Sequence, residues 1–169
     1  VRGMMEYKSL DYTLGPQKPM QENAELLAWS GTNSGPVVAW NDEKPINRWD
    51  DILLLLERLA PEMPLVPDNA AQRIELFGIG HEICGELGFG WNRRLDMMRP
   101  GVDAAGLSEF ARKYGYCDED VELANSRVIA FMTELAATLK AQKERGSEFI
   151  VGQSVTAADF YWAAFSNFV

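Results

Sequence analysis

The sequence predicts a mixed α/β unit that ends near Glu62, followed by an all-helical unit. Two short runs in the first part are typical of strands: residues 10–14 alternate apolar and polar side chains, and residues 36–40 (PVVAW) are apolar and β-branched. The segment 60–67 carries three prolines in eight residues, as linkers often do. After that segment, apolar residues recur at helical spacing. We therefore expect two units joined by a proline-rich segment.

The first part also contains helical patterns. Residues 1–7 are typical of the end of a helix, and residues 22–29 have a helical composition. Residues 44–47 follow a polar turn and are expected to return as the second strand of a hairpin. Residues 50–59 place acidic side chains in a first turn and Arg58 in a last turn, as the helix dipole favours.

The second part is expected to be helical throughout. Asp68 is placed to cap a helix over residues 70–83, and a short helix is expected over 107–114. The strongest pattern follows Asp118, where apolar residues recur every three or four positions until Gly146, which is placed to end that helix.

The segment "SVTAADF" at 154–160 indicates the start of a further helix. Thr156 and Asp159 have the spacing of a capping box, in which the Thr hydroxyl accepts from the Asp backbone N–H while the carboxylate accepts from the Thr N–H. Val155 and Phe160 are spaced to form a hydrophobic staple across the same turn. The sequence therefore predicts a helix that begins directly after Thr156.

Composition excludes several classes of function. The 169 residues are 47% hydrophobic and 24% charged, as in globular proteins, so we do not expect disorder. A net charge of −9 opposes binding to nucleic acid or to anionic membrane surfaces. The run of residues 52–56 (ILLLL) is far too short to span a membrane. These features indicate a cytoplasmic protein with no nucleic-acid or membrane partner.

Metal and disulfide chemistry are not expected. Cys84 and Cys117 lack the spacing of metal ligands, and His81 is the single histidine. Cys84 lies among apolar residues and is expected to be buried and inert, whereas the negative charge of Asp118 should disfavour the thiolate of Cys117.

Three landmarks together resemble the glutathione S-transferase family: "GPVVAW" at 35–40, "INRWDDILLLLERLAP" at 46–61 and "SVTAAD" at 154–159. The resemblance implies an α/β thioredoxin-like N-terminal domain over residues 1–62, lacking its first strand, and an all-α helical-bundle C-terminal domain over 63–169. Both domains are then partial, because Val1 would fall inside the family's first helix and the last helix would be cut short. We therefore expect a chain truncated at both ends.

The resemblance also implies a site for glutathione as co-substrate. The family carries a cis-proline before its third strand, and Pro36 matches that position. A cis Gly35–Pro36 bond would leave the N–H and C=O of Gly35 free to pair with an extended tripeptide. If the bond is trans, Pro36 simply opens a strand.

The next family contact falls on Arg48 and Trp49, which replace an acidic residue and a Ser at the start of the third helix. A helix N-terminus beside Arg48 could still bind the γ-glutamyl carboxylate. In the alternative, Trp49 packs and Arg48 pairs with Asp50 and Asp51.

The implied activity is conjugation of the glutathione thiolate to a small electrophile, in a possible homodimer. The family's catalytic Tyr, Ser or Cys is expected upstream of Val1, so no catalytic residue is assigned. Tyr7 is the alternative candidate for the catalytic residue, and packing in the fold is the other explanation for its position. A protein of this shape can also be a non-catalytic binding or protein-interaction module, and the departure at Arg48 and Trp49 favours that alternative.

For each of four further residues, the sequence leaves a functional and a structural explanation open. His81 is a candidate base or a packing residue. Aromatic and basic side chains that could border a cleft for the electrophile, or form a surface patch, are Trp91, Arg93 and Arg94.

Overall fold

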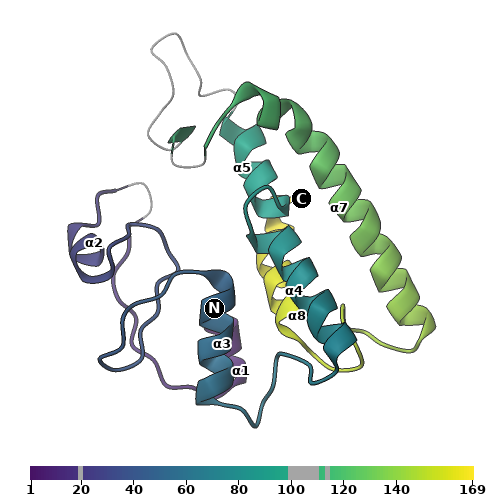
Figure 1. Ribbon diagram of the computed structural model, residues 1–169, viewed down its shortest axis with the longest axis horizontal. Helices are drawn as coiled ribbons and strands as arrows, with labels where there is room; N and C mark the ends of the chain where they lie inside the picture. The colour runs from purple at the N-terminus through teal and green to yellow at the C-terminus, as the bar shows by residue number, and fades with distance from the viewer. Residues whose placement is uncertain (19–20, 99–110, 113–114) are drawn as a thin grey trace. The chain divides into compact units, whose positions relative to one another are not determined.

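The computed structural model describes residues 1–18, 21–98, 111–112 and 115–169 (Figure 1). They form two compact units, Val1–Leu65 and Val66–Val169. The division falls within the proline-rich segment 60–67. Apart from residues 111–112, the helix expected at 107–114 lies outside the described residues.

The first unit is built on helix α3, Trp49–Leu59, with the shorter helices α1, Arg2–Tyr7, and α2, Ala24–Ser30. All three lie close to the ranges that the sequence predicts. Four apolar side chains of α3 lie within one stripe of the helix and are buried. They are Ile52, Leu53, Leu55 and Leu56.

Strands are not formed in the part of the first unit that the structure describes, and here the sequence prediction is wrong. Residues 10–14 have no assigned secondary structure and no neighbouring strand among the described residues, and strand assignment requires such a partner. The expected hairpin between residues 36–40 and 44–47 is reduced to one antiparallel bridge. In that bridge Val38 and Ile46 exchange two N–H···O bonds of 2.8 Å.

Lys8 fixes the end of α3 from the turn that follows α1. Its buried Nζ donates to the carbonyl oxygens of Ala60, at 2.8 Å, and Met63, at 2.7 Å, and forms an ion pair of 2.8 Å with Glu57. The same carboxylate oxygen of Glu57 accepts from the backbone N–H of Leu65 at 3.0 Å. A cation at a helix C-terminus also complements the helix dipole.

The described residues of the second unit form helices α4, Ala70–Cys84, α5, Phe89–Met98, α7, Asp118–Glu144, and α8, Ala157–Phe165. A short 3₁₀ helix η2, Ser166–Phe168, follows α8. Helix α5 packs against α7 and α4 packs against α8.

Two clusters of the described residues contribute to the core of this unit. Leu95 of α5 is buried against Val121 and Ala124 of α7. The rings of Phe89, Phe131 and Trp162 join α5, α7 and α8, with centroids 5.5 to 6.1 Å apart. Such ring pairs contribute about 0.5–1.5 kcal/mol each beyond the area they bury.

The capping box at Thr156 is confirmed. The Asp159 carboxylate accepts from the Thr156 backbone N–H at 2.8 Å, and the Thr156 side chain accepts from the Asp159 N–H in return. Asp159 also accepts from the backbone N–H of Ile150 at 2.9 Å, so one carboxylate holds both the helix start and the chain before it.

The buried side chain of Gln142 holds the connection between α7 and α8. Its amide Nε2 donates to the carbonyl oxygens of Phe149, at 3.0 Å, and Gly152, at 2.7 Å. Ser147 donates its hydroxyl to the same Gly152 oxygen at 2.7 Å. Gly146 follows the end of α7 with φ +77°, which confirms its role in ending that helix.

The cap of α4 corrects a sequence prediction. Asn69, not Asp68, is the N-cap residue, and its side-chain oxygen accepts from the Gln72 backbone N–H at 3.1 Å. Only the residue directly before the first helical position has the extended backbone from which a side chain reaches that N–H. Asp68 lies one residue too early.

We expect opposite effects from alanine at two helical glycines. A Cβ at Gly90 would lie 2.1 Å from a ring carbon of Phe165, whereas a Cβ at Gly78 would meet nothing within 4 Å. Gly90→Ala should lower the free energy of unfolding by about 1–3 kcal/mol through overpacking. Gly78→Ala should raise it by about 0.5–1 kcal/mol, because alanine loses less backbone entropy in a helix. Urea denaturation tests the pair, and equal signs would contradict the packing described for α5 and α8.

Candidate functional site

Gly35 offers unpaired backbone groups at the surface of the first unit. The Gly35–Pro36 bond is cis, as the resemblance implies, and both residues are exposed. Within the described residues, neither the N–H nor the C=O of Gly35 has a hydrogen-bond partner. Exposed backbone groups of this kind can pair with an extended ligand.

Gln17 is a neighbour of Gly35 that the sequence did not reveal. A Cβ placed on Gly35 would lie 2.3 Å from the Gln17 side-chain oxygen, so this amide lies directly over the glycine. Gln17 and Pro36 both line a groove of about 900 Å³ in the first unit. No motif marks Gln17, because the contact joins two loops.

Arg48 is engaged by its own helix. It is the N-cap residue of α3, and its guanidinium donates to Asp50 through Nε, at 3.1 Å, and through Nη2, at 2.6 Å. Asp51 lies 3.4 Å from Nε. These hydrogen bonds from Arg48 hold the pKa of the Asp50 carboxyl below its usual value. An anionic ligand at this helix start would compete for Arg48 with the carboxylates of Asp50 and Asp51.

Trp49 is the first residue of α3 and is half-buried. The side chain of Arg48 makes no capping hydrogen bond to the first turn. Neither Arg48 nor Trp49 lines the groove beside Pro36. The four residues expected at the glutathione site therefore form two pairs, Gly35 with Pro36 and Arg48 with Trp49.

The basic residues of α5 bind the C-terminal end of the second unit. Arg93 donates through Nε to the carbonyl oxygen of Phe168 at 2.6 Å. The Arg94 guanidinium lies over the rings of Phe165 and Phe168, 5.6 and 5.3 Å from their centroids. These contacts hold Arg93 and Arg94 against the last helical turns, which neither explanation from the sequence had included.

Tyr7 and His81 lie at exposed positions. Tyr7 is the last residue of α1 and is 36% exposed. His81 lies in the last turn of α4, with its ring close to Gly85, where a Cβ would lie 2.6 Å from Nδ1. No group of three or more His, Cys, Asp or Glu side chains that could hold a metal ion occurs among the described residues.

The two thiols differ in environment. Burial raises the pKa of the Cys84 thiol to about 12, as expected for an inert residue. The backbone N–H of Asp120 favours the Cys117 thiolate, but the Asp120 carboxylate, desolvation and Glu119 outweigh it, and the pKa of the thiol is raised. The acidic partner is Asp120, at 3.2 Å from Sγ, and not Asp118 as the sequence suggested.

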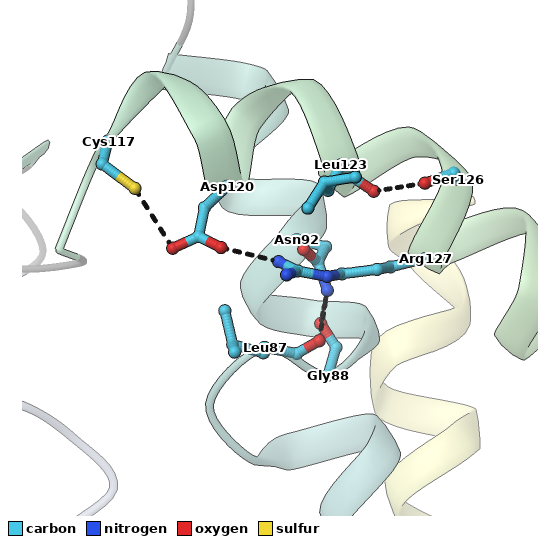
Figure 2. A network of polar contacts seen from close by, with 8 residues as sticks. All are labelled: Leu87, Gly88, Asn92, Cys117, Asp120, Leu123, Ser126 and Arg127. Atoms are coloured by element: carbon cyan, nitrogen blue, oxygen red, sulfur yellow. Dashed lines mark hydrogen bonds and ion pairs between the residues drawn. The ribbon is translucent and has the colours of Figure 1, made fainter.

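Figure 2 shows how this contact continues. Asp120 uses its other oxygen to accept from Arg127 at 2.9 Å. Nearby, Nδ2 of the buried Asn92 donates to the carbonyl oxygens of Leu87 and of Gly88, the latter at 2.9 Å. The Asn92 contacts stay within the start of α5 and the loop before it. The Asp120 contacts stay within the first turns of α7 and its N-cap.

None of the helices in the described part of the chain is long and apolar enough to cross a bilayer.

Along nearly all of its length the chain has the fold of a glutathione S-transferase. A glutathione S-transferase from Methylobacterium radiotolerans, in complex with glutathione sulfonate, matches 97% of this chain and 69% of its own, with a TM-score of 0.69 and 16% identity. The enzyme from Xanthobacter autotrophicus matches 97% and 73%, with a TM-score of 0.63 and 15% identity. A Tau class enzyme from mango, Mangifera indica, matches 96% and 66%, at 0.65 and 19%. No family model and no curated protein matches the sequence.

Proposed function

We propose that this chain is a glutathione S-transferase-like protein that conjugates the glutathione thiolate to a small electrophile. The observation that carries the proposal is the unpaired, exposed backbone of Gly35 in a chain with this fold. Glutathione is an extended tripeptide, and its main-chain groups can pair with the N–H and C=O of that glycine. The neighbour from Methylobacterium radiotolerans, which holds glutathione sulfonate, supports the choice of ligand.

We also propose the two-domain organisation that the sequence predicts. Residues 1–62 act as a partial thioredoxin-like, glutathione-binding domain and residues 63–169 as a partial helical domain, in a cytoplasmic homodimer. The antiparallel bridge between Val38 and Ile46 supports the thioredoxin-like assignment. The N-terminus of α3, with Arg48 and Trp49, receives the γ-glutamyl carboxylate.

Isothermal titration calorimetry with glutathione tests the proposal. We expect saturable heat at millimolar ligand, and Gly35→Pro, which removes the N–H, should weaken binding by about tenfold. Gly31→Pro is not a matched control, because Gly31 has φ +74° and its N–H is bonded to Leu27. Gly78→Ala, at an exposed position of the second unit with open space around the glycine, should leave the affinity unchanged. Absence of heat at millimolar glutathione would contradict the proposal.

A second substitution tests the helix start. Asp50→Asn should tighten glutathione binding by about threefold, because it removes a carboxylate that competes for Arg48 and repels the ligand. Asp42→Asn removes the same charge from an exposed turn of the same unit and corrects for the change in net charge. Equal affinities of the two variants in calorimetry would exclude α3 from the site.

The alternative is a non-catalytic binding or interaction module. The pairing of Arg48 with Asp50 and Asp51 favours it, since the basic side chain is already engaged. Such a module would give no glutathione-dependent conjugation of 1-chloro-2,4-dinitrobenzene, a general electrophile, even at saturating glutathione.

A further inference from the structure

Gln17 places its carboxamide where a side chain of residue 35 would lie. Its nitrogen Nε2 is 2.9 Å, and its carbon Cδ 3.0 Å, from the position that a Cβ on Gly35 would take. The amide of Gln17 has no hydrogen-bond partner among the described residues. Gln17 is exposed and lines the groove beside Pro36. Its donors and its acceptor are therefore available to a ligand that reaches Gly35.

The residue that follows Gln17 is held by Asn23, directly before α2. The Asn23 side chain accepts from the backbone N–H of Lys18 at 2.8 Å, and it donates to the carbonyl oxygens of Lys18, at 3.0 Å, and Gln21, at 2.9 Å. Although Asn23 is the N-cap residue of α2, its side chain makes no capping hydrogen bond to that helix. Because these bonds fix Lys18, they also hold Gln17 beside Gly35.

The chemistry of glutathione determines which of its residues would pair with Gly35. The glutamyl residue has a free amine and the glycyl residue a free carboxylate, so only the cysteinyl residue has both an amide N–H and an amide C=O. Two residues that exchange both bonds lie opposite each other in an antiparallel pair, with their side chains on one face and their Cβ atoms about 4.5–5.5 Å apart. The cysteinyl sulfur would therefore project to the face on which the Gln17 amide lies.

We propose that Gln17 donates a hydrogen bond from Nε2 to the cysteinyl sulfur of bound glutathione and thereby favours the thiolate. A hydrogen bond to the charged form of a group stabilises that form, and a neutral amide supplies it at any working pH. The thiol proton passes to water. The sulfur then forms its bond to the electrophilic carbon as the leaving group departs with its electron pair. This inference rests on the glutathione binding proposed above.

The pKa of the thiol of bound glutathione measures this contact. It is followed by the ultraviolet absorbance of the thiolate, in a pH titration of the whole 169-residue chain saturated with glutathione. Gln17→Met keeps the length of the side chain but removes its N–H donors, and should raise this pKa by about one pH unit. Gln21→Met makes the same change at an exposed residue that does not line the groove, and should leave the pKa unchanged. The charged side chains that line the groove are the same in both variants: Arg2, Asp11 and Glu25.

A substitution at Gly35 tests the same contact from the other side. Gly35→Ala keeps both backbone groups of residue 35, but its methyl group takes the position next to the Gln17 amide and displaces it. This variant should raise the thiol pKa as Gln17→Met does, and the double variant should raise it no further. Additive increases would show that the two residues act on the sulfur separately, and would overturn the proposed contact.

Calorimetry with S-methylglutathione, whose sulfur cannot ionise, separates this inference from the proposed function. If the unaltered chain binds neither glutathione nor S-methylglutathione, the proposed function fails and the role of Gln17 fails with it. If the chain binds both ligands and Gln17→Met leaves the thiol pKa unchanged, only the role of Gln17 fails. Tighter binding of S-methylglutathione by Gln17→Met would show that the amide covers Gly35 instead, and would also overturn its role as a donor to the sulfur.

Discussion

Asp159→Ala is expected to lower the free energy of unfolding by about 3 kcal/mol. The substitution removes the acceptor for two backbone N–H groups, those of Thr156 and Ile150, at 2.8 and 2.9 Å. Loss of a helix cap costs about 0.5–2 kcal/mol, and a backbone donor left without a partner adds about 1–3 kcal/mol. Urea denaturation measures the change, which should appear as a lower midpoint at an unchanged slope.

Two related variants separate the contributions. Thr156→Ala removes the cap but keeps the bond from Ile150, so we expect a loss of about 1–2 kcal/mol. Asp68→Ala changes an exposed acidic residue that caps no helix and should shift the free energy by less than about 0.5 kcal/mol. A loss from Asp159→Ala no greater than that from Thr156→Ala would contradict the role of Asp159 in holding Ile150.

Lys8→Met is expected to destabilise the first unit by about 3–5 kcal/mol. The Lys8 side chain is fully buried, and its removal takes this donor from two carbonyl oxygens and the cation from beside Glu57. The carboxylate of Glu57, whose side chain is 19% exposed, would then lose the cation that lies 2.8 Å from it. Denaturation followed by tryptophan fluorescence measures the loss.

The second substitution Glu57→Gln should restore part of that stability. It removes the carboxylate charge that Lys8 no longer faces but keeps an oxygen that accepts from the Leu65 N–H. We expect the double variant to be more stable than Lys8→Met alone by at least about 1 kcal/mol. Lys18→Met removes an exposed ammonium and should have no measurable effect. Simple additivity of the two single changes would mean that Lys8 and Glu57 do not interact.

Local features of the fold could be predicted because their signals are local. The capping box at Thr156 and Asp159 spans four consecutive residues, and the end of α7 needs one residue at positive φ, which Gly146 supplies. The cap of α4 was misplaced by one position, since Asp68 and Asn69 are equally good capping residues by type. Strand signals failed for another reason, because an extended run becomes a strand only beside a partner.

Contacts between distant residues carried no sequence signal. Lys8 meets Ala60 and Met63 across 52 and 55 positions, and nothing in the local sequence marks a lysine for burial. The contact of Gln17 with Gly35 is similar.

At the candidate site, the cis bond before Pro36 followed from the resemblance, and it is confirmed. The sequence left two explanations for Arg48, and the structure shows the pairing with Asp50 and Asp51. Binding of glutathione to these residues stays a prediction.

Amide chemical shifts followed during titration with glutathione test the central claim most directly. We expect saturable shifts at Gly35 and at the first residues of α3, Trp49 and Asp50, at millimolar ligand. Shifts that are absent, or confined to residues 66–169, would contradict the account.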